Sequence, residues 1–438
     1  MINTQRKVQH LFLRAGFGES PLNIQKLTGK PREKLVRMLF NDSKPVNNLQ
    51  ELRNPIRGKE ASNLKIALLI LRSKDQIKSL NLAWLDKMAH ESAQLREKMT
   101  LFWHGHFATK VPFAYLMQVQ NNTLREHALG SFRNLLHAIA KDPAMLIFLN
   151  NHQNRKQSPN ENFARELMEL STLGEGHYSE EDIKEAARAF TGWQVNKGGK
   201  FFFNTKQHDF GDKTIFGKTG DWNGDDIIDF ILDNPRTAEF ITTKVYSYFV
   251  NETINEDRIQ QLSKTFFESN YNIQSLLEAI FLADWFYESH NVGTKISSPI
   301  ELIVRYRRLF DLQVKDKELW LRTQKVLGQM IFNPPNVAGW PGGQTWIDSS
   351  SLLFRMNLAP LFFKYERVPK WSNTKSDWSA INPVFENMDQ KEMITNVLNH
   401  FLQTEATSKA DLIKNYLRDG SPESAVIRTM MLPEFQLI

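Results

Sequence analysis

Apolar residues recur about every 3.6 positions along most of the chain, which predicts a mainly α protein. The pattern is strongest from residue 61 to 107, a run that closes with LFWHGHF. Its apolar face consists of Leu82, Leu85, Met88, Ala89, Leu95, Met99 and Phe102. A further helix is predicted from Tyr115 to about Ala140, and helices return from residue 225 onwards. We therefore expect a large multi-helix domain.

The helical pattern breaks in two places. Residues 197–220 contain FFF and then HDFG, which predict a short extended or β excursion. Residues 333–346 read NPPNVAGWPGGQTW, and so many Pro and Gly residues predict a loop. The expected architecture is one large helical domain over residues 1–438 with long Pro/Gly loops, and the alternative is a subdivision near residues 197–224.

Capping signals predict where several helices begin. A serine followed three residues later by Glu or Asp occurs at Ser158 with Glu161, at Ser179 with Asp182 and at Ser298 with Glu301. This spacing is typical of a capping box, in which each residue bonds to the backbone N–H of the other. We expect Pro159 to be the first helical residue after Ser158.

The stretch from Ser158 to Trp193 carries the first candidate chemistry. Arg165, Glu166 and Glu169 fall on one polar arc of its first predicted helix. The arc is either an active-site wall, with Arg165 as an orienting cation, or a solvated and structurally paired face. His208 and Asp209, in the non-helical excursion, are further candidates for acid/base catalysis.

Tryptophans supply a second candidate feature. Hydrolysis of a glycoside needs two carboxyl groups about 5–10 Å apart, and aromatic rings commonly support the sugar. Glu166 is the first candidate carboxyl group, with Asp209 or Glu169 as the second. The candidate platforms are Trp103, Trp193, Trp340 and Trp346, each of which has core packing or loop anchoring as its alternative role.

His104 and His106 are candidate metal ligands. Histidine is the commonest metal ligand, and Glu166, Glu169 or Asn162 would complete a site for zinc, manganese or iron. Residues two apart on a helix point about 200° from one another, so the pair converges on one ion only if the helix ends at Gly105. A divalent metal ion and a metal-free site therefore remain alternatives.

Composition narrows the function classes. The chain has no cysteine, which excludes disulfides, thiolate metal sites and cysteine nucleophiles. Its net charge of +6 over 438 residues is small, and no basic tract favours nucleic-acid binding. No apolar run is long enough to predict a membrane span or a signal peptide, so we expect a cytoplasmic protein.

Several motifs, taken in order, resemble the bacterial family called domain of unknown function 1800 (DUF1800). They include HLFLRAGFG, LREKMTLFWHGHFAT, NENFARELMELSTLGEGHYSEEDIKEAARAFTGW, HDFGDKTIFG, KISSPIELIV, NPPNVAGWPGG and PEFQL. The resemblance runs from about residue 9 to the end. It implies that relatives are often exported and are often encoded beside a sulfatase- or phosphatase-like protein, which makes a periplasmic or extracellular location the alternative.

Two functions are consistent with these observations. The first is a hydrolase acting on a glycan or related polymer, with an acid/base or metal site around Glu166. The second is a non-enzymatic helical protein that binds or assists its genomically linked partner. We expect the enzyme to place Arg165 and Glu166 on a cleft wall beside an open tryptophan, and the accessory protein to pair them in a closed core.

Overall fold

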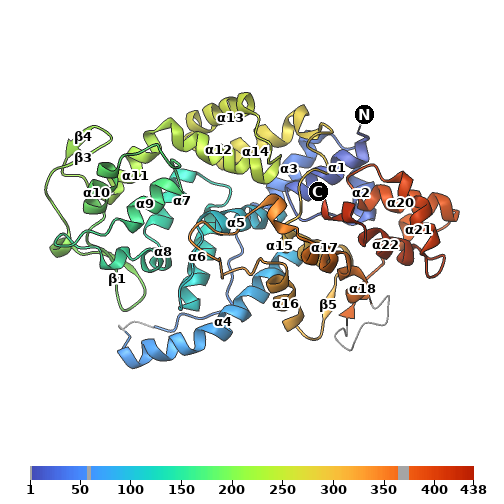
Figure 1. Ribbon diagram of the computed structural model, residues 1–438, viewed down its shortest axis with the longest axis horizontal. Helices are drawn as coiled ribbons and strands as arrows, with labels where there is room; N and C mark the ends of the chain where they lie inside the picture. Colours follow the sequence, from blue (N-terminus) through green and yellow to red (C-terminus); the bar gives the residue numbers. More distant parts are fainter. Residues whose placement is uncertain (1, 57–60, 364–373) are drawn as a thin grey trace.

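The computed structural model describes residues 2–56, 61–363 and 374–438, and it confirms a mainly α fold. The helices of the first half are α1 (Thr4–Arg14), α2 (Pro21–Leu27), α3 (Arg32–Asp42), α4 (Asn63–His90), α5 (Gln94–His106), α6 (Ala114–His127), α7 (Phe132–Ala140), α8 (Pro143–Phe148), α9 (Asn162–Glu169) and α10 (Glu180–Ala189). In Figure 1, α5 and α6 occupy the centre of the molecule, and α4 runs beneath them.

The predicted extended excursion is confirmed as two small antiparallel hairpins. Strand β1 (Trp193–Val195) pairs with β2 (Phe201–Phe203), and β3 (Lys213–Ile215) pairs with β4 (Lys218–Gly220). Ile215 is fully buried, and Phe201 and Trp222 pack on the same core as the helices around them. The excursion therefore folds against the helical body (Figure 1).

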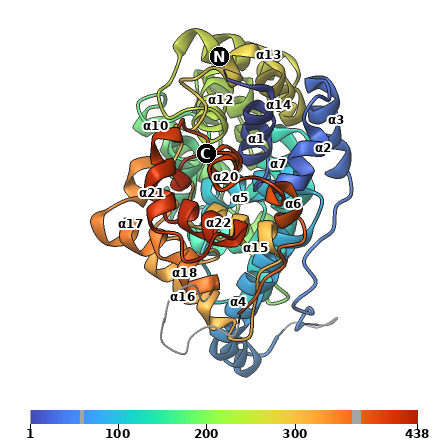
Figure 2. The same ribbon diagram turned by 90° about the vertical axis from the view of Figure 1, so that its right-hand side faces the viewer.

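The second half returns to helices. They are α11 (Gly224–Asp233), α12 (Pro235–Phe249), α13 (Glu256–Glu268), α14 (Ile273–Leu282), α15 (Pro299–Phe310), α16 (Glu318–Val326), α17 (Ser349–Met356), α18 (Leu358–Phe363), α19 (Asn382–Phe385), α20 (Gln390–Phe401), α21 (Ala410–Asn415) and α22 (Pro422–Met430). One further small hairpin joins β5 (Gln313–Val314) to β6 (Thr374–Lys375). Figure 2 shows α20–α22 gathered beside α15.

The apolar core consists of two clusters that meet at α5. One cluster lies among α1, α3, α5, α7 and α9–α14, and the other lies among α4, α6, α15, α16 and α18–α22. Met99 and Trp103 of α5 belong to the first cluster, whereas Leu101 belongs to the second. Burial of both faces explains why α5 is enclosed along nearly its whole length.

The capping boxes begin two helices as predicted. Ser179 and Asp182 bond reciprocally at the start of α10, and Ser298 and Glu301 do so at the start of α15. The third prediction is wrong, because α9 begins at Asn162 rather than at Pro159. The side-chain oxygen of Asn154 accepts a bond from the backbone N–H of Asn160, which holds residues 154–160 as a loop.

The single helix predicted from Tyr115 to Ala140 is also wrong. The structure divides it into α6 and α7 at Gly130, whose carbonyl accepts a bond from the N–H of Ile273. This tertiary bond uses a backbone group that a continuous helix would need for itself. Within the described ranges, no helix is both long and apolar enough to cross a membrane.

Candidate functional site

The polar arc of α9 is engaged in ion pairs and hydrogen bonds. Arg165 contacts Glu180 at 2.7 Å and Glu161 at 3.3 Å, and all three side chains are partly exposed. Glu169 accepts a 2.7 Å bond from the Tyr178 hydroxyl. Exposed pairs of this kind contribute little to stability, and they leave Arg165 and Glu169 occupied.

Glu166 stands apart from these pairs. Its carboxyl group is half-buried, and its pKa is raised, first by that burial and then by the neighbouring charge of Glu169. It precedes Leu170 by one turn on the same helical face, and Leu170 lines the cavity described below. Glu166 is thus one turn from a lining residue but is not itself among the described lining residues.

His208 and Asp209 lie in a different environment. The His208 ring is buried, bonds through Nδ1 to the carbonyl of Thr191 at 2.9 Å and sits edge-on to Phe203 and Phe210. Asp209 pairs with Arg188 at 2.7 Å. Within the described residues, the partners of His208 and Asp209 are not partners of His106 or Glu166. The structure therefore does not place His208 and Asp209 in one cluster with His106 and Glu166.

The four tryptophans separate into two pairs. Trp103 is fully buried and donates to the carbonyl of Ala128, and Trp193 is buried in β1. Neither indole offers a surface to a substrate. Trp340 and Trp346, in contrast, line a common cavity, where Trp340 is half-buried and Trp346 is buried.

His104 and His106 diverge because α5 continues through Gly105. His104 is fully buried, and its Nε2 accepts a 3.0 Å bond from the N–H of Phe332. Burial lowers its pKa to about 3, so the ring is neutral and its remaining N–H lies on Nδ1. The two rings therefore do not face one ion.

His106 turns toward the cavity instead. Its Nε2 bonds to the carbonyl of Ser171 at 3.0 Å, and its ring stacks on Phe102. Burial lowers its pKa to about 3. Throughout the described chain, no group of three His, Cys, Asp or Glu side chains is placed to hold a metal ion.

The cavity that includes His106, Trp340 and Trp346 has a volume of about 460 Å³ and opens to solvent. We call it the site cavity. It lies where the end of α5, the C-terminal part of α12 and the start of α15 meet the loop of residues 333–346. Its ionisable lining residues are His106, Lys244, Tyr248, Glu252, Lys295 and Glu301.

A buried ion cluster forms the floor of the site cavity. Glu301 pairs with Lys98 through Oε1, and the same oxygen lies 3.5 Å from the ammonium of Lys295. The other carboxylate oxygen accepts the N–H of Ser298 in the capping box. All three charged side chains are less than one-tenth exposed. The two lysines hold the pKa of Glu301 well below its usual range against the effect of burial, so it is a permanent anion.

Lys295 is the titratable member of this cluster. Its ammonium donates to the carbonyl of Tyr248 at 2.6 Å and lies 4.1 Å from the centre of that ring. Burial lowers its pKa to about 8, although Glu301 opposes the shift. An ammonium has three N–H donors, so one remains after the contacts with Tyr248 and Glu301. Lys295 can therefore exchange a proton with a bound molecule near neutral pH.

Close backbone contacts position the loop that covers the site cavity. Gly339 adopts φ +80°, and a side chain there would overlap the carbonyl of Gly105 at the end of α5. Gly343 adopts φ +61°, and a methyl group there would overlap the carboxylate of Glu252. Only glycine combines these left-handed conformations with such close approaches. The loop thereby holds Trp340 and Glu252 against the cavity.

Sequence reasoning missed most of the ionisable residues of this cavity. Glu301 was interpreted only as a capping residue, although its carboxylate also faces two lysines. The sequence carries one signal, because the charged run of Arg96, Glu97 and Lys98 lies within a stretch of mostly apolar helical pattern. The structure buries all three side chains. Charged residues in such a helix are almost never enclosed unless they are paired.

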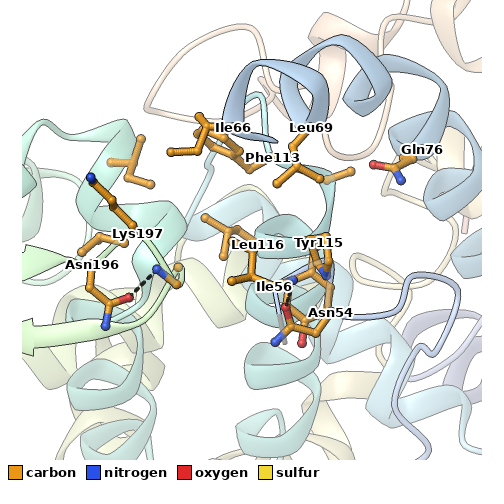
Figure 3. A pocket seen from close by; sticks show the side chains of 16 residues that line it. Asn54, Ile56, Ile66, Leu69, Gln76, Phe113, Tyr115, Leu116, Asn196 and Lys197 are labelled. Carbon is orange, nitrogen blue, oxygen red and sulfur yellow. Dashed lines mark hydrogen bonds between the residues drawn. The ribbon is translucent and has the colours of Figure 1, made fainter. Parts of the chain in front are cut away.

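A second cavity, of about 110 Å³, lies between the first half of α4, α6 and the turn between β1 and β2. Figure 3 shows Ile66 and Leu69 of α4 facing Leu116 of α6 across it. Lys197 is its one charged residue within the described chain. The described lining is mostly apolar and places no carboxylate beside Lys197, so the candidate site remains the site cavity.

Comparisons with known proteins give one match. The family described as "Protein of unknown function (DUF1800)" matches residues 10–437, which is nearly the whole chain. No curated protein and no solved structure matches the chain.

Proposed function

The chain belongs to the DUF1800 family, whose description assigns no activity, and we propose that it is a hydrolase that cleaves a glycan or a related polymer in the site cavity. One observation carries the proposal. The paired charges of Lys295 and Glu301, the carboxylate of Glu252 and the indoles of Trp340 and Trp346 face one solvent-connected space.

This combination suits a sugar chain. The half-buried indole of Trp340 offers apolar surface to a sugar ring, and the surrounding charged groups can bond to its hydroxyls. In this proposal Glu252 and Glu301, rather than Arg165 and Glu166, provide the charged groups beside Trp340. Glu166, one turn from the lining residue Leu170, would contact the polymer only outside the cavity.

Roles follow from the charge of each group. Glu301 cannot supply a proton, because its pKa lies far below neutral, so it holds Lys98 and Lys295 in place. In place of the usual second carboxyl group, the ammonium of Lys295 would donate a proton to the leaving glycosidic oxygen as the C–O bond breaks. Glu252 would accept a proton from the water that forms the new C–O bond. Solvent then restores both groups.

This assignment predicts a pH dependence. Because the pKa of Lys295 is about 8, cleavage should fall about tenfold per pH unit above that value, as the ammonium donor is lost. Release of reducing ends from a panel of neutral and acidic polysaccharides, followed from pH 6 to 10, measures the profile. Lys295→Arg should lower cleavage across the whole range, since an arginine keeps its charge but does not give up a proton to the leaving oxygen.

The control is Glu256→Gln, which changes an exposed carboxylate in the first turn of α13, outside the site cavity. It should keep wild-type cleavage, whereas Glu252→Gln should lower it. Equal rates for these two variants would contradict the role of Glu252. Binding without cleavage of every polymer on the panel would instead support the non-enzymatic binding function.

A further inference from the structure

A third cavity adjoins the site cavity at Trp340. It has a volume of about 630 Å³ and lies between the second half of α4, helix α16 and residues 328–340. Helices α4 and α16 contact one another and lie side by side in Figures 1 and 2. Trp340 lines both cavities, so this indole is where the two cavities adjoin.

The lining of this third cavity is strongly basic. Its charged residues within the described part of the chain are Lys74, Lys78, Glu318, Arg322 and Lys325, which are four cations and one carboxylate with a net charge of +3. Lys78 lies 3.5 Å from Glu318, so the carboxylate is already shared with one of the lysines. A concave surface of one sign concentrates ions of the opposite sign. We call this space the basic cavity.

The site cavity differs in its charge balance. Lys244 and Lys295 face Glu252 and Glu301 there, while His106 is neutral because its pKa is about 3. Counting Lys98, which pairs with Glu301 in the floor, the described charges are three lysines and two carboxylates, a net charge of +1 against +3 in the basic cavity. An anion brought into the site cavity would meet both carboxylates, so an uncharged, hydroxyl-rich unit suits this space better.

We propose that the polymer is an acidic polysaccharide in which charged and neutral sugars are separated. A neutral sugar lies in the site cavity, the chain crosses Trp340, and a carboxylate or sulfate of a neighbouring sugar lies in the basic cavity. The inference rests on the proposed hydrolase, because it names the substrate of the same site. It requires no metal or cofactor.

Nucleic acid is the competing anionic polymer, and the charge pattern disfavours it. A nucleic acid carries a phosphate at every residue, so one phosphate would lie close to Glu252 and Glu301. A polysaccharide with alternating uronate and neutral sugars avoids this repulsion. The two polymers can therefore be distinguished by direct binding.

The test measures binding separately from cleavage. Hyaluronan, which alternates uronate with a neutral sugar, should bind more tightly than the neutral polymer dextran, with an affinity that falls as salt rises. The triple variant Lys74→Gln, Arg322→Gln and Lys325→Gln should weaken hyaluronan binding about tenfold at low salt, because attraction between exposed charges is lost. Titration with tryptophan fluorescence or calorimetry provides the affinities.

The matched control neutralises three exposed lysines outside both cavities, at Lys184, Lys264 and Lys391. It lowers the net charge equally and should leave hyaluronan binding unchanged. Equal affinities for dextran and hyaluronan, or equal losses in the two triple variants, would overturn the inference. Tight binding of single-stranded oligothymidylate without binding of hyaluronan would replace it with a nucleic-acid site.

Failure of the two proposals can be told apart. If the basic-cavity variant loses hyaluronan binding but no polymer is ever cleaved, the acidic-polymer inference stands and the hydrolase proposal fails. If a neutral polymer is cleaved with the pH dependence of Lys295 and the basic-cavity variant is unaffected, the hydrolase stands and the acidic-polymer inference fails.

Discussion

Glu301→Gln is expected to lower the free energy of unfolding by about 3–5 kcal/mol, the usual cost of removing one partner from a buried ion pair. Glutamine can still occupy the capping box at the start of α15, so the variant keeps the helix start and removes only the charge. Two enclosed ammonium groups, those of Lys98 and Lys295, would then face an uncharged side chain. Urea unfolding at pH 7 measures the loss.

Two comparisons show whether the lost stability comes from the unpaired charges of Lys98 and Lys295. Adding Lys98→Met to Glu301→Gln should recover part of the stability, because one of the two unpaired charges is gone. Glu268→Gln removes the carboxylate of an exposed pair with Lys264 on α13, and should cost about 0.5 kcal/mol or less. Similar losses of stability for Glu268→Gln and Glu301→Gln would contradict the conclusion that Glu301 neutralises two buried lysines.

Gly343→Ala should reduce cleavage about a hundredfold while the protein remains folded, because displacement of a reacting group by about 1 Å can cost this much. The added methyl group would overlap the carboxylate of Glu252, and this exposed side chain can escape by rotating away from the cavity. The left-handed φ of +61° adds roughly 1 kcal/mol of backbone strain. Cleavage rate and urea unfolding, measured together, separate the two effects.

A glycine outside the site cavity provides the control. A methyl group at Gly420 has no atom within 4 Å, and its φ is not left-handed. Gly420→Ala should therefore keep both activity and stability. A Gly343→Ala enzyme with normal cleavage would show that the position of Glu252 does not matter for the reaction.

Local signals in the sequence predicted much of the fold. Capping boxes at Ser179 and Ser298 and the break in periodicity near residues 197–220 depend on residues close together in the chain, and the structure confirms them. The predicted start of α9 and the predicted unbroken helix through Gly130 were wrong. Bonds from Asn154 and Ile273 override the local preference there, and a periodicity argument contains no such partners.

The candidate site was harder to predict because its charges come from distant segments. The loop tryptophans were identified as candidates, since a stretch rich in Pro and Gly brings side chains to a surface. Lys98 and Glu301, in contrast, are about two hundred residues apart, and each has a local explanation as part of a helix. Only the folded structure shows that Lys98 and Glu301 form an ion pair beneath the site cavity.

The backbone around Lys295 has a consequence for synthesis of the protein. Ile296 pairs with Leu437, and Lys295 exchanges two backbone bonds with Ile438, so this cavity segment is held by residues made more than a hundred positions later. Lys98 leaves the ribosome long before Lys295 and Glu301, the other two members of the charged floor. Until residues 437–438 are made, the backbone around Lys295 lacks the residues that hold it. We therefore expect the segment around Lys295 to be the last to become protected from proteases during translation.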